Sequence, residues 1–278
     1  CGLLEPLAAT AQELGYILKP VMLAKEEIDN YYFGFSNEII WPLFHDLQSR
    51  CNFQPAYWNA YVTVNRKFAR VLADTIGPRD YVWVHDYHLM LVGRELRAIG
   101  LEQKIGFFLH TPFPPLDIFV KLPWRTQILN ALLEYDLLGF QTIRDRNNFL
   151  HCIVTMLKSY HVDARRQVST IATPKRDIKV GSFPIGIDFT EYRRQAGSPA
   201  VLEAARKLRQ ALPNQRMILG VDRLDYSKGI PEKLRGFRNA LERFEDLHGK
   251  MTLVQVVVPS REDIAQYQSL RSEIEGLV

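Results

Sequence analysis

Short apolar runs alternate with helical patterns along most of this chain. From about residue 81, each run is followed by a polar turn and then by residues with a helical period. The runs are YVWV (81–84), IGFFL (105–109), DLLGF (136–140), IKVGSF (178–183), MILGV (217–221) and TLVQVVV (252–258). Continuous Val, Ile, Leu and Phe runs between helices are typical of a parallel sheet covered on both faces. The pattern therefore predicts an α/β fold.

A domain boundary is expected near PIGID (184–188), where Pro and Gly interrupt the alternation. It divides the chain into residues 1–186 and 187–278. The sequence of residues 161–177, HVDARRQVSTIATPKRD, predicts an exposed loop or a hairpin. The second part is short for a complete doubly wound domain.

Composition narrows the class of protein. The 278 residues are 47% hydrophobic and 24% charged, with a net charge of +4, and the Lys and Arg are mixed with acids. That balance does not indicate a nucleic-acid partner. No apolar stretch approaches the roughly 18 to 20 residues of a membrane span, and no signal peptide is recognisable. Cys1, Cys51 and Cys152 form no CxxC pair, so we expect reduced thiols in a cytoplasmic protein.

Polar residues follow most of the predicted strands. In an open parallel sheet, ligands bind beyond the carboxyl ends of the strands. Helix caps favour Ser, Thr, Asp and Asn over Arg, Lys and His, so capping does not account for the whole set. The set is His85, Asp86, Tyr87 and His88; His110 and Thr111; Gln141 and Thr142; Arg223, Asp225 and Lys228; Ser260 and Arg261.

The turn GVDRLDYSKGIPEK (220–233) gives the sharpest chemical signal. Ser227 is a candidate helix cap, and Pro231 suits the first turn of the helix. Free N–H groups and the positive end of the helix dipole would then lie beside Arg223 and Lys228, which predicts an anion site for a phosphate or diphosphate. No Walker loop, GxGxxG or DxD triplet occurs, so the two cations would replace a metal. A solvated charged turn is the alternative.

Other candidates leave alternatives open. HDYH (85–88) has the residue types of a metal site, but its spacing is not helical and no third ligand is evident, so we expect no metal. His110 is either a site residue or a core histidine. Tyr32 and Trp41 are either core aromatics or residues at a pocket rim, where their O–H and N–H groups bind a sugar or phosphate.

Seven motifs, taken in order, resemble the trehalose-6-phosphate synthase family. They are YYFGFSNEIIWPLFH, VWVHDYHLML, IGFFLHTPFP, YDLLGFQT, PIGID, VDRLDYSKG and PSRED. The resemblance implies a GT-B glycosyltransferase with two Rossmann-like domains. It also implies retaining, metal-independent transfer of glucose from UDP-glucose to glucose 6-phosphate, which gives trehalose 6-phosphate. No cofactor is implied, and a homo-oligomer or a trehalose-phosphatase partner is a further expectation.

The resemblance also implies roles for individual residues. It places Arg223 and Lys228 on the donor diphosphate, and His110 near the transferred glucose. With Asp86, these are the implied catalytic residues.

The implied acceptor site contains Asp86, which holds hydroxyl groups, and Tyr32, Trp41 and Arg261, which surround the phosphate. Asp222 and Asp225 are expected to orient Arg223 and brace its turn.

The chain lacks two parts of the family pattern. Residues 1–186 resemble the acceptor domain without its first strand and Gly-rich loop. Residues 187–278 resemble the first part of the nucleotide-sugar domain, without its later acidic segment. Both domains are therefore expected to be incomplete, and the 278 residues to be inactive alone. The alternatives to this function are a glucosylglycerol-phosphate synthase and a non-catalytic regulatory subunit of a trehalose complex.

Overall fold

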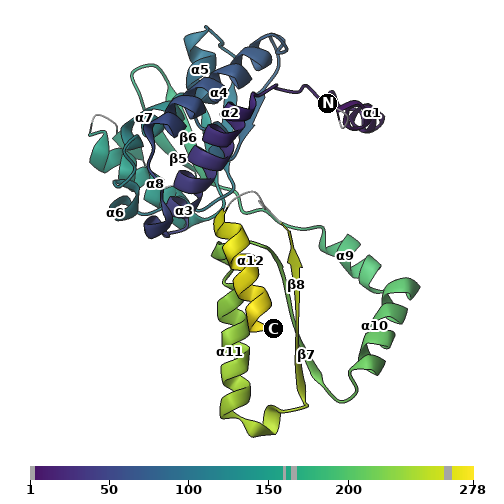
Figure 1. The fold of residues 1–278 in the computed structure, drawn as a ribbon. Helices are drawn as coiled ribbons and strands as arrows, with labels where there is room; N and C mark the ends of the chain where they lie inside the picture. Colours follow the sequence, from purple (N-terminus) through teal and green to yellow (C-terminus); the bar gives the residue numbers. More distant parts are fainter. Residues whose placement is uncertain (1–3, 159–160, 164–167, 260–264) are drawn as a thin grey trace. The chain divides into compact units, whose positions relative to one another are not determined.

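The computed structural model describes residues 4–158, 161–163, 168–259 and 265–278. It divides into two compact units, Cys1–Ile185 and Gly186–Val278 (Figure 1).

Unit 1 is built on a six-stranded sheet with the order β1-β2-β3-β6-β5-β4. The strands are β1 (Val82–His85), β2 (Ile105–Leu109), β3 (Leu137–Phe140), β4 (His161–Asp163), β5 (Val168–Ala172) and β6 (Asp177–Ser182). Neighbours among β1, β2, β3 and β6 are parallel, as predicted. The hairpin alternative for residues 161–177 is found, because β4 and β5 are antiparallel and β5 extends the sheet at β6.

The helices of unit 1 include one wide π-helix among ordinary α-helices and short 3₁₀ turns. They are α1 (Leu4–Glu13), α2 (Lys25–Glu27), the π-helix η1 (Ile28–Ile40), α3 (Trp41–Phe44), η2 (Gln48–Arg50), α4 (Pro55–Ala73), η3 (Tyr87–Leu89), α5 (Val92–Ala98), α6 (Leu116–Phe119), α7 (Arg125–Leu132) and α8 (Ile143–Met156).

Helices cover one face of the unit 1 sheet and form its core there. The Tyr135 ring packs on Phe107 of β2 at a centroid distance of 5.1 Å. The Tyr135 hydroxyl accepts a hydrogen bond from Gly93 N at 2.9 Å, which ties the ring to α5. Phe149 of α8 packs on Phe140 of β3 at 5.3 Å. This dry interface holds the strands, and hence their carboxyl ends, in register.

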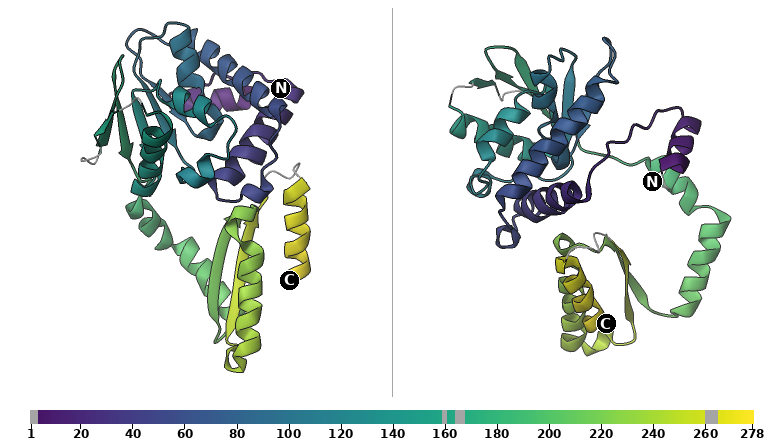
Figure 2. Two further views of the ribbon diagram at one scale, coloured as in Figure 1. Left: turned by 90° about the vertical axis from the view of Figure 1, so that its left-hand side faces the viewer. Right: turned by 45° about the horizontal axis from the view of Figure 1, so that its top comes forward.

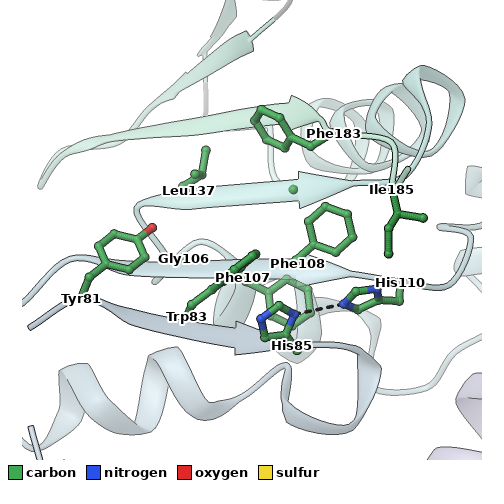
Figure 3. A pocket seen from close by; sticks show the side chains of 11 residues that line it. Tyr81, Trp83, His85, Gly106, Phe107, Phe108, His110, Leu137, Phe183 and Ile185 are labelled. Atoms are coloured by element: carbon green, nitrogen blue, oxygen red, sulfur yellow. Dashed lines mark hydrogen bonds between the residues drawn. The ribbon is translucent and has the colours of Figure 1, made fainter. Parts of the chain in front are cut away.

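The opposite face of this sheet is open in the described part of the chain, so the prediction of cover on both faces is wrong. Trp83 keeps 63% of its surface exposed, and Tyr81 keeps 55%. Their rings, with those of Phe108 and Phe183, lie over a groove of about 500 Å³ (Figure 3). The continuous apolar runs suggested two covered faces, because aromatic residues on this face read like core positions.

Unit 2 contains two parallel strands and their helices (Figure 2). Its elements are α9 (Phe189–Ala196), α10 (Pro199–Ala211), β7 (Arg216–Arg223), η4 (Tyr226–Lys228), α11 (Ile230–Arg243), η5 (Glu245–Leu247), β8 (Met251–Val258) and α12 (Ala265–Leu277). Helices α11 and α12 lie side by side and are joined by an ion pair between Arg235 and Glu273. Leu219 and Val221 of β7 each keep 63% of their surface exposed, so this unit has a thin core.

Candidate functional site

The carboxyl ends of β1 and β2 bring three predicted site residues together. Because these strands are parallel neighbours, His85 at the end of β1 and Asp86 directly after it lie beside His110, which follows β2. The Asp86 Oδ1 atom accepts a hydrogen bond from the His110 backbone N at 3.2 Å. The strand-end rule therefore places Asp86 and His110 correctly relative to each other.

Asp86 has a strained backbone. Its φ of 70° and ψ of 167° lie in a region that is populated almost entirely by glycine. The sheet ladder holds it there, since Asp86 N donates to Phe108 O at 2.7 Å. Such strain costs about 1–3 kcal/mol and concentrates at functional sites. The backbone conformation thus supports Asp86 as a site residue, independently of the motif.

The side chains of His85 and His110 are in direct contact. His85 Nδ1 and His110 Nε2 lie 3.0 Å apart, and one ring nitrogen donates to the other (Figure 3). Burial lowers the pKa of His85; the nearby His110 lowers it further, and the Asp86 carboxylate opposes both effects. Both residues were predicted as strand-end groups, but the contact between them was not. The signal for it was available in the parallel pairing of the two strands.

Tyr32 and Trp41 surround the turn that follows Asp86. The Tyr32 ring stacks on His88 at a centroid distance of 5.7 Å and an interplanar angle of 13°. Trp41 is buried and packs on Tyr87 at 5.8 Å. Trp41 therefore packs as a core residue, whereas Tyr32 is only half-buried. Both contact η3, so η1 and α3 support the loop that carries Asp86.

Other strand-end residues have local structural roles. Thr142 caps α8 by accepting a hydrogen bond from Asp145 N at 3.1 Å. Gln141 accepts one from Ile185 N at 3.0 Å. Thr111 differs, because its hydroxyl oxygen is buried and has no hydrogen-bond partner within the described residues. At the end of β3, helix capping and a loop contact therefore account for the positions of Thr142 and Gln141 without a ligand.

Arg223 and Lys228 lie on a tight turn at the end of β7. Gly229, with a φ of 61°, is the N-cap of α11, and no side chain caps this helix. The prediction of Ser227 as the cap is therefore wrong. Ser227 lies one turn earlier in η4, where its hydroxyl oxygen is buried without a hydrogen-bond partner in the described ranges. The left-handed glycine ends the 3₁₀ turn and starts α11 with its first N–H groups uncapped by a side chain.

The two aspartates of this turn have different roles. Asp225 is fully buried; one carboxylate oxygen accepts from Ser227 N at 2.9 Å and the other from the Tyr267 hydroxyl at 3.2 Å. It braces the turn, as expected. Asp222 instead accepts from Lys233 Nζ at 2.7 Å and from Gln255 at 2.9 Å. The hydrogen bond from Lys233 is the largest cause of the lowered pKa of Asp222.

Ser260 and Arg261 lie outside the described residues. Across the described ranges, no cluster of three or more His, Cys, Asp or Glu side chains has the arrangement of a metal site. In the same ranges, no helix has the length and apolar character of a membrane span.

Comparison with known proteins gives one consistent set of matches. The model of glycosyltransferase family 20 matches residues 8–278. The trehalose-6-phosphate synthase of Mycolicibacterium vanbaalenii is 41% identical, in an alignment that covers 99% of this chain and 57% of the relative.

Two solved structures are similar to this chain, in alignments that cover 92% of this chain and 56% of each solved chain. One is described as trehalose-6-phosphate from E. coli bound with UDP-2-fluoro glucose. Its sequence is 38% identical to this chain, and the TM-score is 0.84. The other is an α,α-trehalose-phosphate synthase (UDP-forming) from Burkholderia xenovorans in complex with glucose-6-phosphate, 33% identical with a TM-score of 0.83. The chain thus spans little more than half the length of these relatives.

Proposed function

The chain belongs to glycosyltransferase family 20, and we propose that the protein it forms transfers glucose, with retention, from UDP-glucose to glucose 6-phosphate to give trehalose 6-phosphate. The α/β fold of the GT-B glycosyltransferases is confirmed by the similarity to solved structures. The names of the relatives support the donor and the acceptor, since one structure holds a UDP-glucose analogue and another holds glucose-6-phosphate.

The turn at the end of β7 carries the proposal. Arg223 is the last residue of β7, and Lys228 directly precedes Gly229, the N-cap of α11, whose first N–H groups have no side-chain cap. A helix N-terminus with two adjacent cations favours a diphosphate. When the bond from glucose to the diphosphate breaks, negative charge grows on the leaving group. Fixed cations at that place stabilise the transition state more than the ground state.

We assign the same two cations the task that a metal ion performs at many diphosphate sites. This assignment rests on their position and charge. The leaving diphosphate would then accept the acceptor's proton as the new glycosidic bond forms on the same face of the sugar.

The end of the unit 1 sheet is the proposed acceptor side. Asp86 holds acceptor hydroxyl groups through its carboxylate, which its strained backbone fixes at the strand end. His110 lies next to it and would contact the transferred glucose. Tyr32, which is half-buried on the π-helix that supports this loop, is a proposed phosphate ligand.

The test is an acceptor-dependent assay of the complete protein. UDP release from UDP-glucose is measured with glucose 6-phosphate, with glycerol 3-phosphate and with no acceptor, and the product is identified by mass spectrometry. We expect release only with glucose 6-phosphate, together with trehalose 6-phosphate as the product. Faster release with glycerol 3-phosphate would replace the proposed acceptor. Tight UDP binding without turnover would instead indicate a regulatory protein.

A further inference from the structure

A fully buried tyrosine is hydrogen-bonded to the backbone directly after Asp86. The Tyr61 hydroxyl, on α4, donates to Tyr87 O at 2.6 Å and accepts from Met90 N at 3.1 Å. Both directions are fixed, because a carbonyl oxygen can only accept and a backbone N–H can only donate. The Tyr61 ring packs on Phe35 of η1 at a centroid distance of 4.3 Å, which holds the hydroxyl in place. One side chain therefore bridges a carbonyl group to an N–H group three residues later.

The next turn of α4 repeats this arrangement with an amide group. Asn65 is also fully buried; its Nδ2 atom donates to His88 O at 3.1 Å, and its Oδ1 atom accepts from Leu91 N at 3.1 Å. These two backbone groups fix the orientation of the amide, since one only accepts and the other only donates. Tyr61 and Asn65 together hold residues 87–91 to α4 at four backbone atoms.

These bonds bear on Asp86 because its backbone is strained. A residue in a sparsely populated conformation relaxes unless its surroundings hold it there. Asp86 N donates to Phe108 O in the sheet at 2.7 Å, and the carbonyl oxygen of the next residue, Tyr87, accepts from Tyr61. The sheet therefore fixes the chain on one side of Asp86, and α4 fixes it on the other.

We propose that Tyr61 and Asn65 are positioning residues for the acceptor: their bonds to residues 87–91 keep Asp86 in the conformation in which its carboxylate holds the acceptor hydroxyl groups. The inference rests on the proposed function. Neither side chain needs contact with a substrate, since both act through the backbone. Without these bonds the turn would relax, and the Asp86 carboxylate would occupy its binding position for only part of the time.

A second buried tyrosine provides a matched control. The Tyr135 hydroxyl donates to Leu89 O at 3.1 Å and accepts from Gly93 N at 2.9 Å, where the turn joins α5. Tyr61→Phe and Tyr135→Phe therefore each remove one hydroxyl group and two hydrogen bonds, but only Tyr61 holds the residue next to Asp86. Because a misplacement of 1 Å costs about 100-fold, we expect Tyr61→Phe to lower kcat/KM for glucose 6-phosphate by about 10- to 100-fold and Tyr135→Phe by less than about 2-fold.

Further measurements on the complete protein separate positioning from stability. Both tyrosine variants should lower Tm by similar amounts, since each removes a partner from one buried carbonyl and one buried N–H group. The KM for UDP-glucose and the Kd for UDP should not change in either variant. Hydrogen exchange at Met90 N–H, which does not depend on activity, should become faster in Tyr61→Phe and stay unchanged in Tyr135→Phe.

Asn65→Leu is the second variant. It removes both bonds of the amide without adding a charge, so it should lower kcat/KM for glucose 6-phosphate and speed exchange at Leu91 N–H. It also replaces Tyr61→Phe as the test if that variant does not fold.

The outcomes distinguish the two proposals. An unchanged kcat/KM in Tyr61→Phe or in Asn65→Leu would overturn the positioning role, and so would unchanged exchange at Met90 N–H in Tyr61→Phe. Equal losses of kcat/KM in Tyr61→Phe and Tyr135→Phe would show a general effect of the core and overturn it as well. If the unchanged protein lacks glucosyl transfer, the proposed function fails, and exchange at Met90 N–H still decides whether Tyr61 holds the turn.

Discussion

The two strand-end regions of this chain are held in place by different means. At the end of β1, a sheet with a covered face and a backbone ladder holds Asp86 in a strained conformation. At the end of β7, the strand is largely exposed, and one buried carboxylate, Asp225, with a left-handed glycine shapes the turn. Packing can hold a strained residue because many contacts oppose its relaxation. A turn in a thin core must instead satisfy its own polar groups.

This comparison predicts a large catalytic effect at the turn in unit 2. Lys228→Ala removes one of the two cations proposed to stabilise the leaving diphosphate. Losing one such preorganised group typically lowers kcat by about 10²- to 10³-fold, or about 2.7–4 kcal/mol. Steady-state assays of the complete protein would measure it, with thermal unfolding to confirm that the fold is retained.

Lys250→Ala is the matched control for Lys228→Ala. Lys250 is an exposed lysine of the same unit, immediately before the amino end of β8. It should keep normal turnover. Equal kcat values for the two variants would remove Lys228 from the proposed mechanism.

Two helical glycines test the difference in packing between the units. A Cβ atom at Gly93 of α5 would lie 2.7 Å from the buried Tyr135 ring, whereas one at Gly236 of α11 would meet nothing within 4 Å. Overpacking costs about 1–3 kcal/mol. Gly93→Ala should therefore lower the free energy of unfolding by about that amount. Gly236→Ala should raise it by up to about 1 kcal/mol, because alanine favours a helix.

Urea denaturation of both glycine variants would give these values. Since each substitution adds the same methyl group to a helix, helix propensity acts in the same direction at both positions. A stabilising Gly93→Ala would mean that α5 shifts away from Tyr135 at little cost, and that unit 1 is packed less tightly than the distances indicate.

The backbone strain at Asp86 gives a smaller effect. Asp86→Ala and Asp86→Gly both remove the carboxylate, but only glycine adopts the observed φ of 70° without strain. Relief of this strain by glycine would stabilise the folded protein by about 1–3 kcal/mol. The greater flexibility of glycine in the unfolded chain offsets about 0.5–1 kcal/mol of that stabilisation. Asp86→Gly should therefore be more stable than Asp86→Ala by up to about 2 kcal/mol, with both variants inactive.

The control for Asp86 uses an aspartate with an ordinary backbone. Asp80 also accepts a backbone hydrogen bond, from Gly77 N at 2.8 Å, and has a negative φ. There the glycine variant should be the less stable of the two. The same order of stability at both positions would show that Asp86 carries no measurable strain.

The sequence predicted the strands and the strand-end chemistry better than their surroundings. Five residues, IGFFL, predicted β2 at its observed bounds. Asp86, His110 and Lys228 follow strands as expected, and Arg223 is the last residue of β7. The prediction from sequence failed where the role of a residue depends on its neighbours in three dimensions. The cap of α11 is Gly229 and not Ser227, because Ser227 lies inside the preceding 3₁₀ turn η4, which the side chain of Asp225 caps. The open face of the sheet was missed because aromatic residues there have the same pattern as core residues.

The weakest contact in the comparison is the ion pair between Asp222 and Lys233. The Lys233 side chain keeps 43% of its surface exposed and the Asp222 side chain 15%. An exposed pair of this kind contributes about 0.2–1 kcal/mol. We expect a double-mutant cycle of Asp222→Asn and Lys233→Ala to give a coupling free energy in that range at neutral pH.

The pH dependence of this pair has a definite sign. The pKa of Asp222 is lowered in the folded protein, so its contribution is fully present above the unfolded value of about 4 and disappears as the pH falls through the lower folded value. The coupling measured by urea denaturation should therefore shrink below about pH 4, and it should also shrink at high salt. A coupling that persists in acid would mean that the hydrogen bond from Lys233 to Asp222 does not depend on the charge of the carboxylate, which would contradict the ion-pair interpretation.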